Sequence, residues 1–365
     1  MKSTPSLLVS TPGLLLFAFV LTACTSDPAS NSNDTTTDSA TPDSASDAPD
    51  PDDTAAQDTG QFTETDSTAP SATDSESTDT SSVSTPEILV GHHQSDLAAI
   101  PESAIALAKQ HLHIVYQHSS HGSQLISGME TLERYPDFGV RFQWSDDGSA
   151  GLDLDDLGIP QAEVADLSAG DSVDENGDTP WVAGTRALLN DPAYSHINVV
   201  MWSWCSINGH NAQRYVDNME TLIAEYPNVA FVFMTGHAEG LGVDMVENGV
   251  HYNNELIRNH CAINHRVLYD FADIEGYDPA GNEFWSKNMN DALDYDGGNW
   301  GVEWIAGNPA NIYSLLTTGE GIDNFSGPAG CAHSASPPEA RINCVRKAVA
   351  AWYLFARLAG WAPVN

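Results

Sequence analysis

Short apolar runs alternate with longer amphipathic segments from about residue 101 to the C-terminus. In the amphipathic segments, apolar residues recur every three or four positions, which is typical of helices that bury one face. The short, continuously apolar runs are typical of strands that are buried on both sides. We therefore predict helices over 101–110, 122–134, 180–189, 212–226, 253–260 and 339–358, and strands over 112–117, 139–144, 197–204, 229–234 and 267–271.

This alternation predicts an α/β fold, a three-layer sandwich with a central parallel sheet. The stretch 145–179 is acidic, rich in glycine and aperiodic, so we expect a long surface insertion there. Sites in such sheets lie at the carboxyl ends of the strands. Four loops are thereby selected as candidates, namely 118–124, 203–211, 235–240 and 272–276.

The N-terminal end has the composition of a targeting segment. Lys2 precedes a short apolar core, and Leu-Thr-Ala-Cys at 21–24 resembles a bacterial lipobox, which implies a signal peptide over 1–23 and a lipid on Cys24. Residues 24–86 are mostly Ser, Thr, Asp, Pro and Ala, with twelve Asp, two Glu and neither Lys nor Arg after the cysteine. Such a segment buries too little apolar surface to fold, so we expect a disordered tether.

The remaining residues, 87–365, are enough for one α/β domain. The chain has 51 acidic and 13 basic residues; leaving out the 14 tether acids and Lys2 gives 37 and 12, a formal net charge near −25. A surface this acidic excludes nucleic-acid binding, which needs basic contacts to phosphate.

Four cysteines follow Cys24, namely Cys205, Cys261, Cys331 and Cys344. Beyond the inner membrane, an even number favours two disulfides, with three possible pairings. Loop closure favours Cys331–Cys344 with Cys205–Cys261. A zinc site is the alternative, although no Cys-x-x-Cys spacing is present.

The turn at 118–124, His-Ser-Ser-His-Gly-Ser-Gln, separates a predicted strand from a predicted helix. A hydroxyl beside an imidazole at this place is the arrangement that nucleophilic acyl transfer needs, and a helix N-terminus favours developing negative charge. The alternative is a polar turn whose serines cap the helix.

Other candidates lie in later loops. Ser203, Ser206 and Asn208 follow the strand at 197–204 and could stabilise an oxyanion, while Trp202 and Trp204 could stack against a sugar. His237 lies in the Gly-rich turn 235–240, and His333 precedes the last helix. Each of these residues is also compatible with a structural role in a turn or in the core.

Evidence for a cofactor is lacking at the sequence level, and we expect neither a cofactor nor a resident metal. The acidic segments 174–178 and 294–299 resemble parts of calcium-binding loops, but neither has the full twelve-residue ligand spacing.

Taken together, the motifs resemble the SGNH (GDSL-like) hydrolase superfamily. The resemblance rests on the order of the loops and on Tyr-Gln-His-Ser-Ser-His-Gly-Ser-Gln at 116–124, Phe-Met-Thr-Gly-His at 233–237, Leu-Tyr-Asp-Phe-Ala-Asp-Ile-Glu at 268–275 and Ala-Arg-Leu-Ala-Gly-Trp at 356–361. It covers about residues 105–360 and implies a flavodoxin-like sheet of the SGNH type. It is similar to a branch found among secreted bacterial lipoproteins.

The resemblance implies Ser120 as nucleophile, with Ser119 as its competitor, and His333 as general base. The backbone N–H of the nucleophile and a group near 203–208 would form the oxyanion hole. The chain departs from the superfamily in lacking Gly-Asp-Ser-Leu and a clear Gly-x-Asn-Asp. It also has Gly330 where the superfamily has the Asp three residues before the histidine, and Asp323 is the candidate replacement.

The combined interpretation is a serine esterase or deacetylase that acts on acylated extracellular carbohydrate, with His118, His121 and His237 lining its pocket. We expect a monomeric outer-membrane lipoprotein facing either the periplasm or the medium, with the lipid as its only membrane contact. Two alternatives remain. One is an inactive glycan-binding module, and the other is a metal-dependent hydrolase using His118, His121, His237 and His333.

Overall fold

A computed structural model describes residues 87–159 and 165–363. The predicted signal peptide 1–23, the predicted lipidation site Cys24 and the predicted tether 24–86 lie outside the described residues. None of the helices in the described part has the length and apolar composition needed to cross a bilayer.

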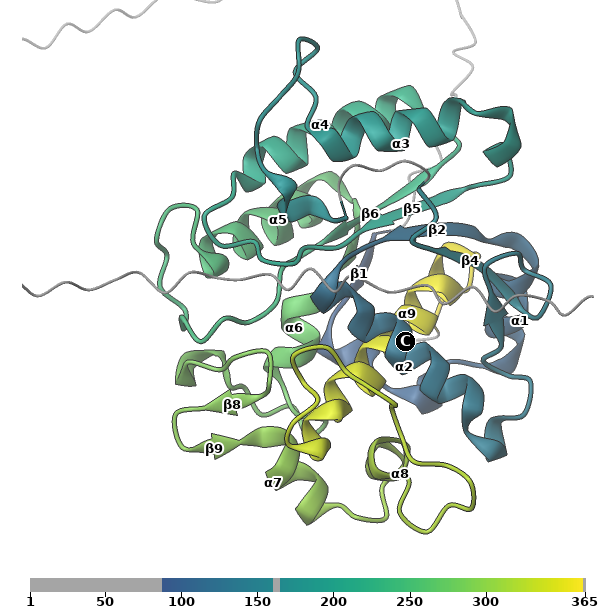
Figure 1. Ribbon diagram of the computed structural model, residues 1–365, viewed down its shortest axis with the longest axis vertical. Helices are drawn as coiled ribbons and strands as arrows, with labels where there is room; N and C mark the ends of the chain where they lie inside the picture. The colour runs from purple at the N-terminus through teal and green to yellow at the C-terminus, as the bar shows by residue number, and fades with distance from the viewer. Residues whose placement is uncertain (1–86, 160–164, 364–365) are drawn as a thin grey trace, which may run out of the picture. The chain divides into compact units, whose positions relative to one another are not determined.

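A seven-stranded sheet forms the centre of the described part (Figure 1). Every strand pairs with its neighbours in parallel, in the order β1-β7-β6-β5-β2-β4-β3. The strands are β1 (Ile88–Val90), β2 (His113–Gln117), β3 (Trp144–Ser145), β4 (Leu152–Asp156), β5 (Val199–Trp202), β6 (Ala230–Met234) and β7 (Val267–Tyr269). A separate hairpin joins β8 (Asp294–Tyr295) to β9 (Gly298–Asn299).

Helices cover both faces of the sheet, as the predicted three-layer α/β sandwich requires. In Figure 1, α1, α2 and α9 lie on one face, and α3, α4 and α5 lie on the other. The helices are α1 (Glu102–His111), α2 (Ser123–Arg134), α3 (Pro180–Asn190), α4 (Ala212–Glu225), α5 (Val250–Asn264), α6 (Phe271–Gly276), α7 (Trp300–Gly307), α8 (Ile312–Thr318) and α9 (Ile342–Leu358).

The core follows the hydrophobic pattern. The central strands β2, β5 and β6 are apolar along almost their whole length because helices pack on both sides of them. Helix α9 is buried from Ile342 to Ala356, in the layer that it shares with α1 and α2. These predicted elements are confirmed, with ends that shift by a few residues.

Two predictions between residues 139 and 179 were wrong. Residues 139–142 form turns, and only Trp144 and Ser145 pair as strand β3. The expected surface insertion contains β4, which pairs with β2 inside the sheet. Leu152 and Leu154 of β4 are fully buried, whereas its carboxylates find histidine partners, for example Asp153 with His113 at 2.6 Å.

The disulfide prediction was half right. Cys331 and Cys344 form a disulfide that ties the loop before α9 to its first turn. The predicted Cys205–Cys261 bridge is wrong, because Cys261 is a buried free thiol. Cys261 lies at the end of α5, near the start of β7, whereas Cys205 follows the end of β5. In a parallel α/β sheet, the residues before a strand and those after a strand lie at opposite ends of the strands. The two sulfur atoms are therefore too far apart to form a bond.

Candidate functional site

The site lies where β2, β5 and β6 end. Because these strands are parallel and adjacent, their following loops meet at one edge of the sheet. Gly122, in the short 3₁₀ helix η3 (Ser120–Gly122), allows two of these loops to pack together. A Cβ atom at this position would collide with the Ser203 hydroxyl and the His118 side chain.

Ser120 and His333 are brought together from 213 positions apart in the sequence. The Ser120 Oγ lies 2.5 Å from His333 Nε2, within hydrogen-bond distance. Ser120 opens η3, which leads directly into α2, and His333 lies in the loop before α9. Its ring is partly open to solvent, with a side-chain exposure of 33%. This geometry allows the imidazole to take the hydroxyl proton.

The backbone at His333 has a left-handed conformation, with φ of 63°. A residue other than glycine adopts this conformation at a cost, so its surroundings have to hold it. The next residue, Ser334, is fully buried; its hydroxyl donates to the Asp291 carbonyl at 2.5 Å and accepts from the Asn343 amide at 3.0 Å. The Cys331–Cys344 disulfide holds the loop from the other side.

Asp291 is the carboxylate beside His333, and the sequence analysis did not single it out. Its Oδ2 lies 3.7 Å from His333 Nδ1, which is ion-pair distance but longer than a hydrogen bond. The same oxygen accepts a 2.7 Å hydrogen bond from His121 Nε2. Asp291 lies in an irregular loop 42 positions before His333, and no motif in the sequence connects the two.

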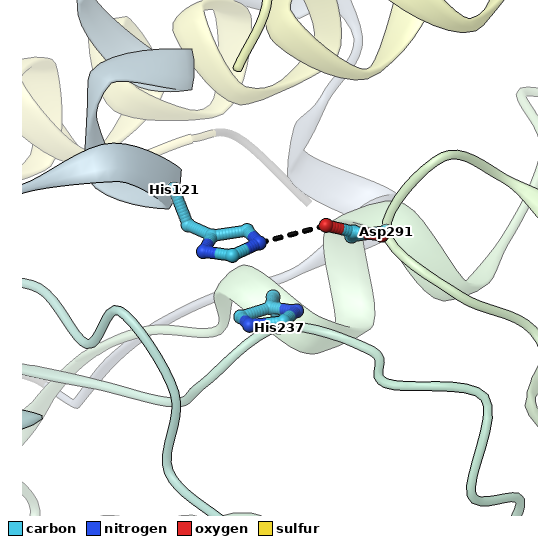
Figure 2. Close-up of side chains that lie close together, drawn as sticks. All are labelled: His121, His237 and Asp291. Atoms are coloured by element: carbon cyan, nitrogen blue, oxygen red, sulfur yellow. Dashed lines mark hydrogen bonds and ion pairs between the residues drawn. The ribbon is translucent and has the colours of Figure 1, made fainter. Parts of the chain in front are cut away.

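Three imidazole rings form a stack at this point. The His121 ring lies between His237, with centroids 3.5 Å apart, and His333, with centroids 3.8 Å apart. The two rings of each pair are nearly parallel, with an interplanar angle of 9°. In Figure 2 the His121 and His237 rings lie one above the other, with the Asp291 carboxylate beside them.

Burial disfavours the protonated form of the two buried rings, His121 and His237. It lowers the pKa of His237 to about 3, with a further contribution from the neighbouring His121. Burial also lowers the pKa of His121, although the hydrogen bond to Asp291 opposes this. For Asp291, burial raises the pKa, but the His121 hydrogen bond and the facing imidazoles outweigh it, so the net shift is downward. These directions favour neutral imidazoles at His121 and His237 beside an ionised Asp291 carboxylate.

The structure distinguishes the two candidate nucleophiles, Ser119 and Ser120, by their hydrogen-bond partners. The Ser119 hydroxyl donates to the Asp166 carboxylate and is thereby directed away from His333. Asp323, the candidate orienting acid, is exposed and makes no hydrogen bond or ion pair with any described residue. Within the described part of the chain, the carboxylate at His333 is therefore Asp291 rather than Asp323.

The other residues predicted to line the pocket do not contact Ser120 or His333 through hydrogen bonds. Ser203 is buried, and its hydroxyl has no partner among the described residues. The Ser206 hydroxyl donates to Glu239 Oε1 at 2.6 Å, and Asn208 is exposed. His118 is not part of the stack, because its Nε2 is 2.7 Å from Asp156 Oδ1.

Neither tryptophan is open to a sugar, which corrects the stacking prediction. Trp202 is 2% exposed and donates to the Thr185 hydroxyl at 2.9 Å. Trp204 is 3% exposed and donates to the Met234 carbonyl at 3.0 Å. Both side chains stabilise the core behind the loops, because a buried indole N–H needs such a partner.

The chain matches no protein-family model, no curated protein and no solved structure. Function has to be inferred from the geometry of the site itself.

Proposed function

We propose that this protein is a serine esterase that removes acyl groups, acetyl above all, from extracellular carbohydrate. The observation that carries the proposal is the 2.5 Å contact between Ser120 Oγ and His333 Nε2 at the carboxyl edge of the sheet. A serine hydroxyl is a weak nucleophile until a neighbouring base takes its proton, and His333 is placed to do so.

In the proposed mechanism, His333 Nε2 accepts the Ser120 proton while Oγ attacks the ester carbonyl. The protonated imidazole then returns the proton to the departing sugar oxygen, and an acyl-serine remains. Water, deprotonated by the same imidazole, releases the acid and restores Ser120. Asp291, 3.7 Å from His333 Nδ1, stabilises the imidazolium charge. The backbone N–H of Ser120, at the start of η3, is the proposed oxyanion donor.

The strand order supports a flavodoxin-like sheet of the SGNH type as part of this proposal. Without the edge strands β1 and β3, the order is β4-β2-β5-β6-β7, which is 2-1-3-4-5 by position in the chain. Ligands of such sheets bind where the chain order reverses, between the first and third strands. Here these are β2 and β5, whose loops carry Ser120 and Ser203.

An extracellular substrate is proposed from the lipobox at 21–24 and from the acidic composition of the chain. In this proposal the lipid on Cys24 anchors a monomeric protein to the outer membrane. The negatively charged domain then acts on neutral, acylated polymers rather than on anionic ones.

The test is hydrolysis of p-nitrophenyl acetate and acetylated xylan by the purified protein. We expect Ser120→Ala and His333→Ala to lower kcat by at least about 10³-fold. Asp291→Asn should lower kcat by roughly 10²-fold, less than at a tightly bonded triad, because its contact with His333 is long.

Ser119→Ala is the matched control, since it removes the neighbouring hydroxyl but leaves the Ser120–His333 contact in place. It should keep most of the activity. Equal losses from Ser119→Ala and Ser120→Ala, in variants with wild-type circular dichroism, would contradict the assignment of the nucleophile.

A glycan-binding module without turnover is the second candidate. The 3.7 Å separation of Asp291 Oδ2 and His333 Nδ1 favours it, because an imidazole whose Nδ1 has no hydrogen bond to a carboxylate is less well oriented for catalysis. If the folded wild-type protein hydrolyses none of these esters but binds xylan in isothermal titration calorimetry, this second candidate replaces the esterase.

A further inference from the structure

Asp291, which stabilises His333 in the proposed mechanism, also lies beside two histidines to which that mechanism gives no role, His121 and His237. His121 comes from the loop after β2, His237 from the loop after β6, and Asp291 from the loop before β8. One ligand atom from each lies within 4.8 Å of the other two. Figure 2 shows the three side chains converging from separate segments of the chain.

The hydrogen bond at His237 fixes which of its nitrogens is available. Nδ1 is 2.9 Å from the Ala238 carbonyl, which can only accept, so Nδ1 carries the proton. In a neutral imidazole the other nitrogen, Nε2, then carries a lone pair. This Nε2 is buried and has no hydrogen-bond partner among the described residues, in a side chain that is only 6% exposed.

The surroundings of this lone pair are negative rather than proton-donating. Glu239 Oε1 lies 3.7 Å from His237 Nε2, and Asp291 has a carboxylate oxygen within 4.8 Å of a His237 ring nitrogen. Lys347, the nearby buried cation, is already paired with Glu275 at 2.6 Å. A buried lone pair that faces two carboxylates is unfavourable unless a cation lies between them.

Asp291 orients the His121 ring through a hydrogen bond. Its Nε2 donates to Asp291 Oδ2 at 2.7 Å, so a proton now occupies the position between imidazole and carboxylate. Metal binding displaces such a proton, because imidazole ligands bind in their unprotonated form. Two imidazole nitrogens and a carboxylate oxygen are a frequent ligand set of zinc sites that keep an open position.

We propose that His121, His237 and Asp291 bind one Zn²⁺ ion next to the Ser120–His333 pair. The site differs from the four-histidine cluster considered from the sequence. His118 is bound to Asp156 and His333 faces Ser120, so two of the four histidines remain, and Asp291 is the third ligand. Glu239, whose Oε1 also accepts from Ser206, is the nearest additional carboxylate. The proposal is independent of the esterase, because it requires neither Ser120 nor acyl transfer.

The test is Zn²⁺ binding by the full chain without an affinity tag. The protein is freed of metal with a chelator and titrated by isothermal calorimetry in millimolar Mg²⁺ and Ca²⁺, which occupy the acidic surface. We expect one tight equivalent of Zn²⁺. Co²⁺ in its place should give the visible absorption of a low-coordinate site.

His237→Gln and Asp291→Asn should each weaken Zn²⁺ binding at least about 100-fold, because each removes a ligand while keeping a polar side chain of similar size. His260→Ala is the control, since His260 also pairs with a carboxylate, Glu220 of α4 at 2.8 Å, but does not belong to the cluster of His121, His237 and Asp291. It should bind Zn²⁺ as the wild type does.

Ser120→Ala separates this proposal from the esterase, because it should abolish hydrolysis and leave Zn²⁺ binding intact. Absence of a tight equivalent in the folded wild type would overturn the metal site. So would tight binding that survives both His237→Gln and Asp291→Asn.

Discussion

Lys347 and Glu275 form a fully buried ion pair beneath the site, with Nζ and Oε2 2.6 Å apart. The other oxygen of Glu275 accepts from the Ala238 backbone, next to His237. Lys347 also donates to Gln124, whose amide reaches the Ala332 carbonyl beside His333. This pair therefore links the loop of His237 to the loop of His333. Burial lowers the pKa of Lys347 to about 8, and Glu275 opposes the shift.

We predict that Lys347→Met destabilises the protein by about 3–5 kcal/mol, because it leaves the Glu275 carboxylate buried without its counter-charge. The free energy of unfolding in urea measures this loss. Esterase activity should fall as well, since both loops lose a common support.

The double variant Lys347→Met/Glu275→Gln is the control. It removes both charges and keeps an oxygen for the Ala238 N–H, so it should recover a substantial part of the lost stability. If the two substitutions instead add without any recovery, the ion pair is not the cause of the single-variant effect.

Part of the site could be predicted at the level of residues. The loop 118–124 follows an apolar strand and is selected by its position, whereas Ser120 and His333 as a pair are expected from the resemblance to a known superfamily. Asp291 could not be found, because it lies in an irregular loop whose path depends on packing against α9 and the Ser334 hydroxyl. For Trp202 and Trp204 the sequence left a sugar-facing and a core role open, and it could not decide between them. An indole at a strand end looks the same in sequence whether it faces solvent or core.

At the level of elements, strand β4 could not be predicted from the pattern of hydrophobic and polar positions. Its sequence, Leu-Asp-Leu-Asp-Asp, has the alternation of a strand but the charge of a surface loop. The two leucines enter the core, while Asp153 binds His113 of the adjacent β2 and Asp156 binds His118, the residue that follows β2. These partners lie about 40 positions away in the sequence, so only the assembled sheet shows why the acidic strand is stable.

The disulfide between Cys331 and Cys344 joins the His333 loop to the first turn of α9. We predict that Cys331→Ala/Cys344→Ala lowers the free energy of unfolding by about 3 kcal/mol, the loop-entropy effect for a separation of 13 residues. The esterase kcat should fall too, because His333 loses one restraint on its left-handed backbone. Unfolding in urea and steady-state kinetics on the same samples test both effects. Unchanged values in both would show that the loop is held without the bridge.

At the scale of the whole molecule, charge opposes compactness. The 365-residue chain has a formal net charge of −38, and residues 87–365 account for about −25 of it. We predict that the thermal unfolding midpoint rises with NaCl between low and physiological ionic strength, because salt screens the repulsion between exposed carboxylates. Differential scanning calorimetry at constant pH measures the rise, with sucrose as an uncharged control. A midpoint that falls with NaCl would show that attractive ion pairs outweigh this repulsion.

The two edges of the sheet are built from very short strands, three residues in β1 and two in β3. An exposed edge offers unpaired N–H and C=O groups on which strands from another molecule can add. Here each edge presents too few of these groups for a neighbouring chain to align along it. The fold thereby protects a largely apolar parallel sheet against the edge-to-edge growth that leads to fibrils.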